Sequence, residues 1–329
     1  MGQHYMRQKL KAVFSFLIIL ILLPYIAAVF INGGDMKAEG KNNSAFVKVK
    51  KKKSDGEEQI VKVSWEEYFI GMLANEIPES YEEEALKAQA VLIRTTLYQT
   101  LDNSEDKILE DSYLEAKDLE KKWGSKNYDK NYKKLKKAMD DTKNQVLYYN
   151  DAYAMTPFHQ SSNGKTRSGQ EVFGTGDYPY LVVRECPQDK EADDEMHVYT
   201  MDYKEVQSKC QAFLVAVDKE KAKDTYDFSD FEIQEYDSAG YVSKMRIGDT
   251  ICTGEQFREA LSLASSAFSL QDADGRLRIT TMGTGHGVGM SQWTANQMAK
   301  EGKSWEEIVQ KFFEGTNITD GGEIFSKIE

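Results

Sequence analysis

Residues 64–100 read SWEEYFIGMLANEIPESYEEEALKAQAVLIRTTLYQT and predict two helices joined by a sharp turn. Ser64 and Glu67 have the spacing of a capping box, in which a hydroxyl and a carboxylate bond each other's backbone amides at a helix start. We therefore expect the first helix to begin at Ser64 and to run to about Asn75. It should end there because the residue before a proline disfavours helical geometry, and Ile77-Pro78 follows.

A second capping box, from Ser80 to Glu83, predicts another helix that runs to about Thr100. This helix is apolar on most of its faces, which is typical of a buried helix. Arg94 lies within it, and a buried guanidinium without a partner is too costly to keep. We therefore expect Arg94 to have a polar or charged partner in the fold.

The rest of the chain predicts a mixed globular α+β domain over residues 60–320. Residues 103–145 are strongly charged with sparse apolar positions, so we interpret them as a helical insertion, with one or two helices laid over the core or projecting from it. From Val146 the apolar spacing changes to two, which is the period of strands. The predicted strands are QVLYYN (145–150), AYAMTPFHQSS (152–162) and PYLVVREC (179–186), with hairpins over 230–248 and 266–283 and helices over 253–264, 291–302 and 304–313.

Residues 12–31, AVFSFLIILILLPYIAAVFI, carry no charge over about the length of a transmembrane helix, and three basic residues precede them in 1–11. We predict one N-terminal transmembrane helix with a cytoplasmic tail at 1–11. A cleaved signal peptide is the alternative, and both interpretations place the bulk of the chain outside the cytoplasm. Residues 32–59 are charged and poor in apolar side chains, which predicts a solvated linker, and 321–329 form a tail.

Composition excludes several classes of function. The formal net charge of −12 argues against a nucleic-acid partner, and the 40% hydrophobic fraction is enough for one ordinary core or two. Cys186, Cys210 and Cys252 lie far apart and form no C-x-x-C pair, so neither a zinc knuckle nor a redox dithiol is indicated. At most one disulfide can form among them.

Glu76 is the acid in the opening stretch whose position a surface helix does not explain. It falls at the C-terminal end of the first helix, where the helix dipole disfavours a further negative charge, and its neighbours Leu73 and Ile77 are apolar. Both effects favour the protonated carboxyl. A carboxylic acid that stays protonated near neutral pH is what glycosidic cleavage requires of its general acid. A structural ion pair with Arg94 is the alternative, and spacing alone leaves both interpretations open.

A resemblance to a known family rests on three blocks: YFIGMLANEIPESYEEEALKAQAVLIRTTLY at 68–98, FHQSSNGKTRSG at 158–169 and GTGHGVGMSQWTANQMAKEGKSWEEIVQKFFEGTNI at 283–318. In this order they resemble the stage II sporulation protein D family, which has an extracytoplasmic catalytic domain on a single membrane anchor. The resemblance implies a lytic transglycosylase that cuts the β-1,4 bond between N-acetylmuramic acid and N-acetylglucosamine in peptidoglycan and leaves 1,6-anhydro ends. It further implies action on glycan strands denuded of stem peptides, in septal wall remodelling and engulfment during endospore formation. The protein would work at the cell membrane beside stage II sporulation proteins P and M.

The resemblance also assigns site residues. Glu76 matches the catalytic glutamate, which protonates the leaving oxygen and then, as a carboxylate, takes the proton of the sugar's own 6-hydroxyl. A second carboxylate is therefore not needed, in contrast to a hydrolase. Arg94 matches a basic residue required for activity or substrate binding, and Lys165 and Arg167 match positions that contact substrate. Each basic residue also has a plain structural interpretation, as a buried ion pair for Arg94 and as solvated side chains for the other two.

The chain departs from some relatives at His159. Those relatives bind zinc near this loop through two histidines and two cysteines, and His159 matches the first histidine. In this chain Lys165 and Glu171 stand at the cysteine positions and Gln170 at the second histidine, so neither a metal nor any other cofactor is predicted. We expect His159 to pack or to form a hydrogen bond at the wall of the substrate cleft.

The glycine-rich stretch 283–293 has two interpretations. Its glycines permit close backbone approach, so it can line a glycan groove in which Gln292 offers a hydrogen bond and Trp293 an apolar face for a sugar. It can instead be a strained strand-to-helix connection that supports Glu76. Two further classes of function also remain open: a non-catalytic glycan-binding activator of a partner cell-wall amidase, and a scaffold that acts through residues 103–145.

Overall fold

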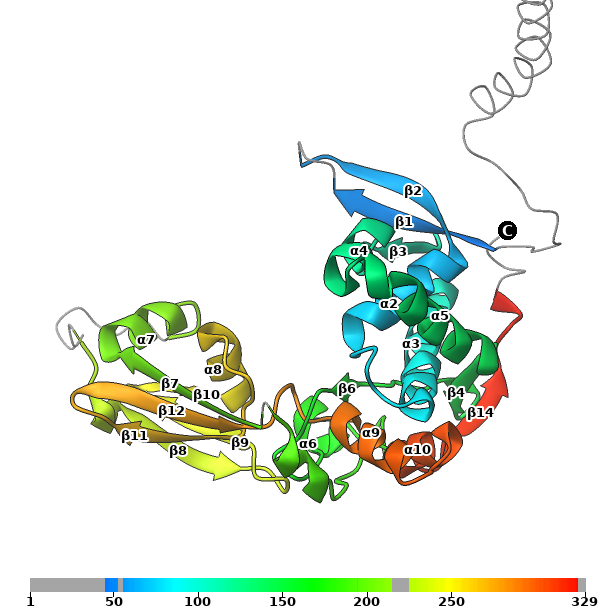
Figure 1. Cartoon of the computed structure of the whole chain (residues 1–329). Helices are drawn as coiled ribbons and strands as arrows, with labels where there is room; N and C mark the ends of the chain where they lie inside the picture. Colours follow the sequence, from blue (N-terminus) through cyan, green and yellow to red (C-terminus); the bar gives the residue numbers. More distant parts are fainter. Residues whose placement is uncertain (1–44, 53–55, 194, 215–224, 325–329) are drawn as a thin grey trace, which may run out of the picture. The chain divides into compact units, whose positions relative to one another are not determined.

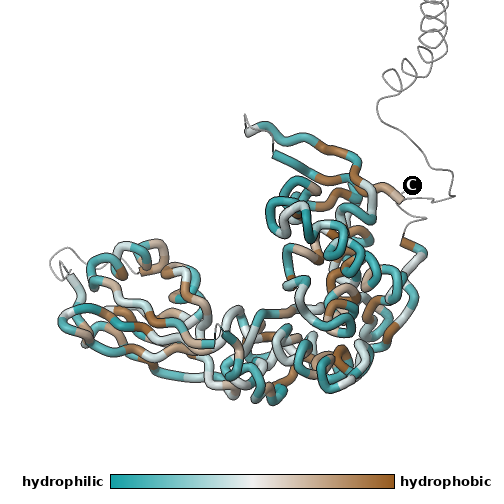
Figure 2. The backbone as a smooth tube through the Cα atoms, in the orientation of Figure 1, coloured by the Kyte–Doolittle hydropathy of each residue, from teal (hydrophilic) through white to brown (hydrophobic). Residues whose placement is uncertain are grey.

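The computed structural model describes residues 45–52, 56–193, 195–214 and 225–324, and Figure 1 traces them. Helices and short sheets are mixed along the chain, which confirms the predicted α+β class. The buried apolar side chains form two main clusters. The first core draws its residues from 47–186 and 288–324, and the second core draws its residues from 203–279. Figure 2 shows hydrophobic positions along the helices and strands that build each core.

The predicted anchor at 12–31 and the tail before it lie outside the described residues. Across the ranges that the structure does describe, none of the helices has both the length and the apolarity to cross a bilayer.

The predicted linker 32–59 differs from the structure in its second half. Residues Phe46–Lys52 form strand β1, which pairs antiparallel with β2 (Glu58–Ser64). Val47 and Val49 alternate with lysines, and this period of two buries one face of the strand although its composition is that of a linker. The compact unit that contains β1 begins at Ala45.

Helix α2 (Trp65–Glu76) begins and ends as predicted. The hydroxyl of Ser64 accepts a hydrogen bond from the amide of Glu67 at 3.2 Å, and the helix stops before Pro78. Helix α3 (Glu83–Asn103) is buried as expected, since most of its side chains are covered.

The start of α3 corrects the predicted capping box at Ser80, because the N-cap is Glu82, two residues later. The amide of Tyr81 bonds the carbonyl of Pro78 in a turn. The amide of Glu82 then bonds the side chain of Asn296 at 2.8 Å. The N-cap residue is thus Glu82, and its amide takes a partner from far along the chain.

Residues 103–145 contain two helices laid over the first core, which is one of the arrangements predicted for them. Leu135 of the second helix is fully buried, and Trp123 of the first is 6% exposed. The segment also contributes a short strand that pairs in parallel with β1 and was not predicted. The elements are β3 (Ile108–Glu110), α4 (Ala116–Trp123) and α5 (Ser125–Asp141).

Short strands and loops follow α5. The predicted strand at 179–186 is wrong, because that segment forms isolated bonds to the loop 164–169 in place of a ladder. The amide of Thr166 bonds the carbonyl of Arg184 at 2.9 Å, and the amide of Gly169 bonds the carbonyl of Leu181 at 2.7 Å. The elements in this part are β4 (Gln145–Tyr149), β5 (Ala152–Tyr153), β6 (Phe158–His159), α6 (Gly169–Phe173) and the 3₁₀ helix η1 (Pro187–Glu191).

The second core lies among two three-stranded antiparallel sheets and two helices. Both predicted hairpins are confirmed, and the predicted capping box at Thr253 begins a helix. That helix ends at Leu261, earlier than predicted, because Ser262 adopts a left-handed conformation with φ of 55°. The elements are β7 (Met196–Asp202), α7 (Tyr203–Cys210), η2 (Phe228–Asp230), β8 (Phe231–Tyr236), β9 (Val242–Ile247), β10 (Thr250–Cys252), α8 (Gly254–Leu261), β11 (Phe268–Asp272) and β12 (Arg276–Met282).

The chain then returns to the first core. Both predicted C-terminal helices are present, and Ser304 forms the expected capping box with Glu307. The elements are β13 (Met290–Ser291), α9 (Gln292–Lys300), α10 (Trp305–Phe312) and β14 (Asn317–Asp320), and β14 pairs with β4. The three cysteines are buried free thiols, and burial raises the pKa of each.

Candidate active site

Glu76 is the last residue of α2 and is half-buried. One carboxylate oxygen accepts a hydrogen bond from the side-chain amide of Asn75 at 3.2 Å. The turn that follows is fixed by Pro78, so the carboxylate stands at the point where the chain leaves one helix to enter the next. The side chain is therefore open to solvent on a rigid support, which a proton-transfer group requires.

Helix α9 holds the backbone around Glu76. The side-chain amide of Gln292 donates to the carbonyl of Glu76 at 2.7 Å and lies 3.1 Å from the side-chain oxygen of Gln89 on α3. The bond from Glu82 to Asn296 adds a second link between α9 and the same turn. Gln292 is only 4% exposed, so its amide faces the protein interior. The first and third sequence blocks thus meet at the end of α2.

The second block joins them through a parallel pairing of β6 with β13, in which His159 lies opposite Ser291. The amide of Trp293 bonds the carbonyl of Gln160 at 3.0 Å. All three blocks on which the resemblance rests therefore converge near the start of α9.

Asp189 is a buried residue that joins the second and third blocks by hydrogen bonds. Its carboxylate is fully buried and accepts hydrogen bonds from the amide and hydroxyl of Ser162 and from the hydroxyls of Ser291 and Thr294. Within the described residues it has no ion-pair partner. These hydrogen bonds satisfy the acceptor oxygens of a buried carboxylate. Asp189 thus ties the second block to the N-terminus of α9, next to Gln292.

The stretch 283–289 leads from β12 into β13 with all four of its glycines at positive φ. A Cβ at Gly289, where φ is 73°, would lie 2.0 Å from the carbonyl oxygen of Pro157, so only glycine fits there. This geometry matches the interpretation of the stretch as a strained strand-to-helix connection.

His159 is 4% exposed, and its Nδ1 lies 3.1 Å from the carbonyl oxygen of Val288. Burial, with a smaller contribution from the neighbouring His286, lowers the pKa of His159 to about 3. The ring is therefore neutral at physiological pH and donates from Nδ1. Its Nε2 has no hydrogen-bond partner among the described residues. The contacts confirm a packed and hydrogen-bonded residue, and the place of His159 at the wall of a substrate cleft stays a prediction.

The two predicted basic contacts in the second block differ in exposure. Arg167 is 6% exposed, and its Nε lies 2.6 Å from the buried carboxylate of Asp237, while its guanidinium stacks over the ring of Tyr241. Lys165 is exposed and pairs with Glu185 at 2.9 Å on the surface. A polymer in solution can reach Lys165, whereas Arg167 is occupied by bonds within the protein.

Arg94 has the partners that its burial requires, and they are neutral. Its guanidinium donates to the hydroxyl of Thr142 and to the carbonyls of Gln145 and Met139 at 3.0 to 3.2 Å, and it lies 4.9 Å from the ring centre of Phe69. Burial lowers the pKa of Arg94 to about 10, so the group stays charged at neutral pH. No bond in the described part of the chain joins Arg94 to Glu76.

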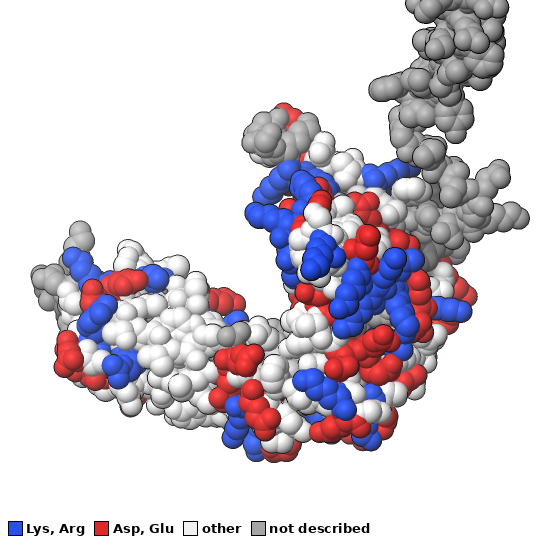
Figure 3. All heavy atoms as spheres, viewed as in Figure 1, with Lys and Arg blue, Asp and Glu red and all other residues white. Residues whose placement is uncertain are grey.

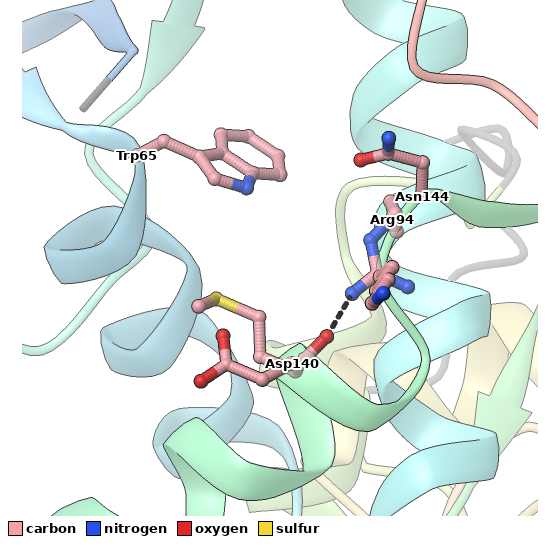
Figure 4. A pocket seen from close by; sticks show the side chains of 6 residues that line it. Trp65, Arg94, Asp140 and Asn144 are labelled. Atoms are coloured by element: carbon pink, nitrogen blue, oxygen red, sulfur yellow. Dashed lines mark hydrogen bonds between the residues drawn. The ribbon is translucent and has the colours of Figure 1, made fainter. Parts of the chain in front are cut away.

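A pocket of about 430 Å³ opens beside Arg94 and is lined by Trp65, Arg94, Met139, Asp140, Lys143 and Asn144. Figure 4 shows the Trp65 indole projecting from α2 on one side of the pocket and Arg94 and Asn144 on the other, with the bond from the guanidinium to the Met139 carbonyl dashed. Trp65 and Glu76 stand at opposite ends of α2, about 16 Å apart along the helix. The pocket is therefore a separate feature from the surroundings of Glu76.

Two buried polar residues near the start of α9, Gln89 and Asp189, were not singled out from the sequence. Gln89 interrupts the apolar run of α3, and a polar side chain on a buried helix is a signal that could have been used. Asp189 lies in a charged stretch that looks solvated, so no local signal marked it.

Comparison with known proteins supports the family resemblance. Residues 53–149 match the family model described as SpoIID, Stage II sporulation protein, and this range includes the helices of 103–145. The chain is 32% identical to stage II sporulation protein D of Bacillus amyloliquefaciens over 282 residues, which cover 80% of this chain and 76% of that protein. It is 31% identical to stage II sporulation protein D of Bacillus subtilis over 281 residues, or 82% of this chain and 78% of that protein. An amidase enhancer of Bacillus subtilis is 22% identical over 293 residues, or 76% of this chain and 40% of that protein. The chain therefore belongs to the stage II sporulation protein D family.

Proposed function

We propose that this protein is a peptidoglycan lytic transglycosylase that cleaves the β-1,4 bond between N-acetylmuramic acid and N-acetylglucosamine. The observation that carries the proposal is the half-exposed Glu76 at the end of α2, whose backbone is held by Gln292 where the three family blocks converge. One acid on a rigid support, open to a polymeric substrate, is sufficient for this reaction.

The reaction uses Glu76 twice. Its carboxylic acid donates a proton to the glycosidic oxygen as the bond between that oxygen and the muramyl C1 breaks. The 6-hydroxyl of the same muramyl ring then bonds to C1, and the Glu76 carboxylate takes the hydroxyl proton. The acid is regenerated and no water is consumed, so the product ends in a 1,6-anhydro ring. General acid and base catalysis of this kind contributes roughly 10²–10⁴-fold in rate.

The remaining predicted site residues take different parts in this proposal. Lys165 is the exposed cation that contacts the glycan. Arg94 can contact a ligand only if the ligand enters the pocket beside its guanidinium. Arg167, His159 and Gln292 are bonded inside the protein and support the site, because side chains 4 to 6% exposed are poorly accessible to a polymer.

We place the reaction outside the cytoplasm, with residues 12–31 as the membrane anchor. The related proteins are named for sporulation, which supports a role in septal wall remodelling and engulfment during endospore formation. Denuded glycan strands are the proposed substrate, and stage II sporulation proteins P and M are the proposed partners.

A second candidate is a non-catalytic, glycan-binding activator of a cell-wall amidase. It is favoured by the similarity to the amidase enhancer and by the burial of four of the five predicted substrate-binding residues, all except Lys165.

The deciding experiment digests denuded glycan strands with Glu76→Gln and with Glu79→Gln as the matched control. Glu79 is half-buried three residues away in the same turn. The proposal expects anhydromuramyl ends from the native protein and the Glu79 variant and a loss of at least roughly 10²-fold with Glu76→Gln. If the native protein releases no such ends, and both variants stimulate the amidase equally, the activator is the better account.

A further inference from the structure

The β1–β2 hairpin has one face that the first core does not cover. Val47, Val49 and Val63 point into the core and are at most 7% exposed. The opposite face is the outer face of the hairpin, and Lys50 on it pairs with Glu58 at 2.8 Å. Its side chains are Phe46, Lys48, Lys50, Lys52, Glu58, Ile60, Lys62 and Ser64.

Two features of the outer face are unfavourable for a strand pair in water. Phe46 and Ile60 are 59% and 58% exposed, although the alternation of a half-buried strand places polar residues on its outer face. Lys48 lies directly opposite Lys62 in the register, and like charges in that position repel. Among the described residues neither of these two lysines has a carboxylate partner. Both features become favourable when the hairpin lies on a negatively charged surface with an apolar layer beneath it. The two lysines then contact the negative charges, and Phe46 and Ile60 contact the apolar layer.

An anionic lipid surface has that chemistry. Lysine ammonium groups bind phosphate headgroups, while an aromatic and a branched aliphatic side chain enter the boundary between headgroups and acyl chains. The chain as a whole carries −12, so an anionic surface repels most of it. Figure 3 shows lysine and arginine side chains over β1 and β2 and over the neighbouring α4 and α5. The outer face is therefore a positively charged region on a negatively charged protein, and it can orient the protein relative to an anionic membrane.

The hairpin lies close in sequence to the predicted membrane anchor, and this indicates which surface its outer face binds. Only residues 32–45 separate Phe46 from the end of the uncharged segment 12–31, and a chain of that length spans at most about 50 Å. We propose that the outer face binds the anionic surface of the same bilayer that holds residues 12–31. This inference rests on the proposed anchor and is independent of glycan cleavage. Its consequence is that the domain is held against the membrane by a second contact.

The test places the full chain in lipid nanodiscs of phosphatidylcholine, with or without phosphatidylglycerol, and measures acylation of each lysine by mass spectrometry. Lys48 and Lys62 should react several-fold more slowly in the anionic discs, since each contact is worth roughly fivefold. High salt should restore their reactivity. Lys204 and Lys300, which are also exposed, serve as internal controls and should not change.

A matched pair of variants completes the test. Lys48→Glu with Lys62→Glu should abolish the lipid dependence at Lys50 and Lys52, and Lys204→Glu with Lys300→Glu should preserve it. Both variants should digest glycan strands in detergent as the native chain does, so failure of this inference is distinguishable from failure of the proposed function. Equal lysine reactivity in both kinds of disc would overturn the inference. Protection by soluble anionic wall polymer in place of anionic lipid would also overturn it.

Discussion

Replacement of Arg94 by Met tests whether its guanidinium is first a structural group. The change removes three hydrogen bonds, to Thr142, Gln145 and Met139, and the contact with Phe69. The two carbonyls lose their donor, at about 1–3 kcal/mol each, and the ring contact adds about 0.5–2 kcal/mol. Relief from burying a charge offsets part of this sum. We expect a net loss of about 2–5 kcal/mol of stability in the first core.

Tryptophan fluorescence during urea unfolding measures this loss selectively. All four tryptophans belong to or pack against the first core, so their emission reports that core alone: Trp65, Trp123, Trp293 and Trp305. At a slope of roughly 1–3 kcal/mol per molar urea, the midpoint should fall by about 1 M or more. Arg276→Met is the control, because its ion pair with Asp202 is exposed and worth less than about 1 kcal/mol.

A structural role for Arg94 is refuted if Arg94→Met unfolds at the native midpoint while glycan cleavage is lost. That outcome would assign the guanidinium to ligand binding through its pocket, with no structural contribution.

Three further predictions concern the supports of the site. His159 is protonated in the unfolded chain below pH 6.5 but stays neutral in the folded chain down to about 3, so stability should fall by about 1 kcal/mol between pH 7 and 5.5 on its account. Urea unfolding of His159→Gln at both pH values should show a shallower dependence, and an unchanged one would contradict the assigned burial. Gln292→Glu replaces a donor with an acceptor that faces the Glu76 carbonyl, so kcat should fall about tenfold or more with little change in KM, while Gln297→Glu on the same helix should be neutral. Asp189→Ala leaves four buried donors unsatisfied and should cost about 3–5 kcal/mol by tryptophan fluorescence, with Asp189→Asn intermediate; a native midpoint for both would exclude the carboxylate as a connection between blocks.

Helix starts were predictable where the capping residues are neighbours in sequence. The capping boxes at Thr253 and Ser304 form as expected, because both partners lie within one helical turn. The start of α3 was not predictable from Ser80, since the N-cap is Glu82, whose amide bonds Asn296 across 214 positions. The strand predicted at 179–186 fails for a related reason: strand propensity requires a ladder partner, and the fold offers only isolated bonds.

The candidate site likewise has features that local sequence predicts and features that it does not. Glu76 could be singled out from its place at a helix end, and the need for a partner of Arg94 followed from burial alone. The identity of those partners did not follow, because carbonyls in the last turn of α5 and at the start of β4 can satisfy a guanidinium as well as a carboxylate can. The contact of Gln292 with Glu76 joins residues 216 positions apart, and no local pattern encodes it.

The oxygen source of the cleaved bond tests the central claim most directly. Denuded glycan strands are digested in water enriched in heavy oxygen, and the new muramyl ends are weighed by mass spectrometry. If Glu76 serves the ring's own 6-hydroxyl, the ends are anhydro and carry no heavy oxygen, and Glu76→Gln forms none of them. Ends that gain one heavy oxygen would mean that water attacks C1, which would contradict the single-acid transglycosylase.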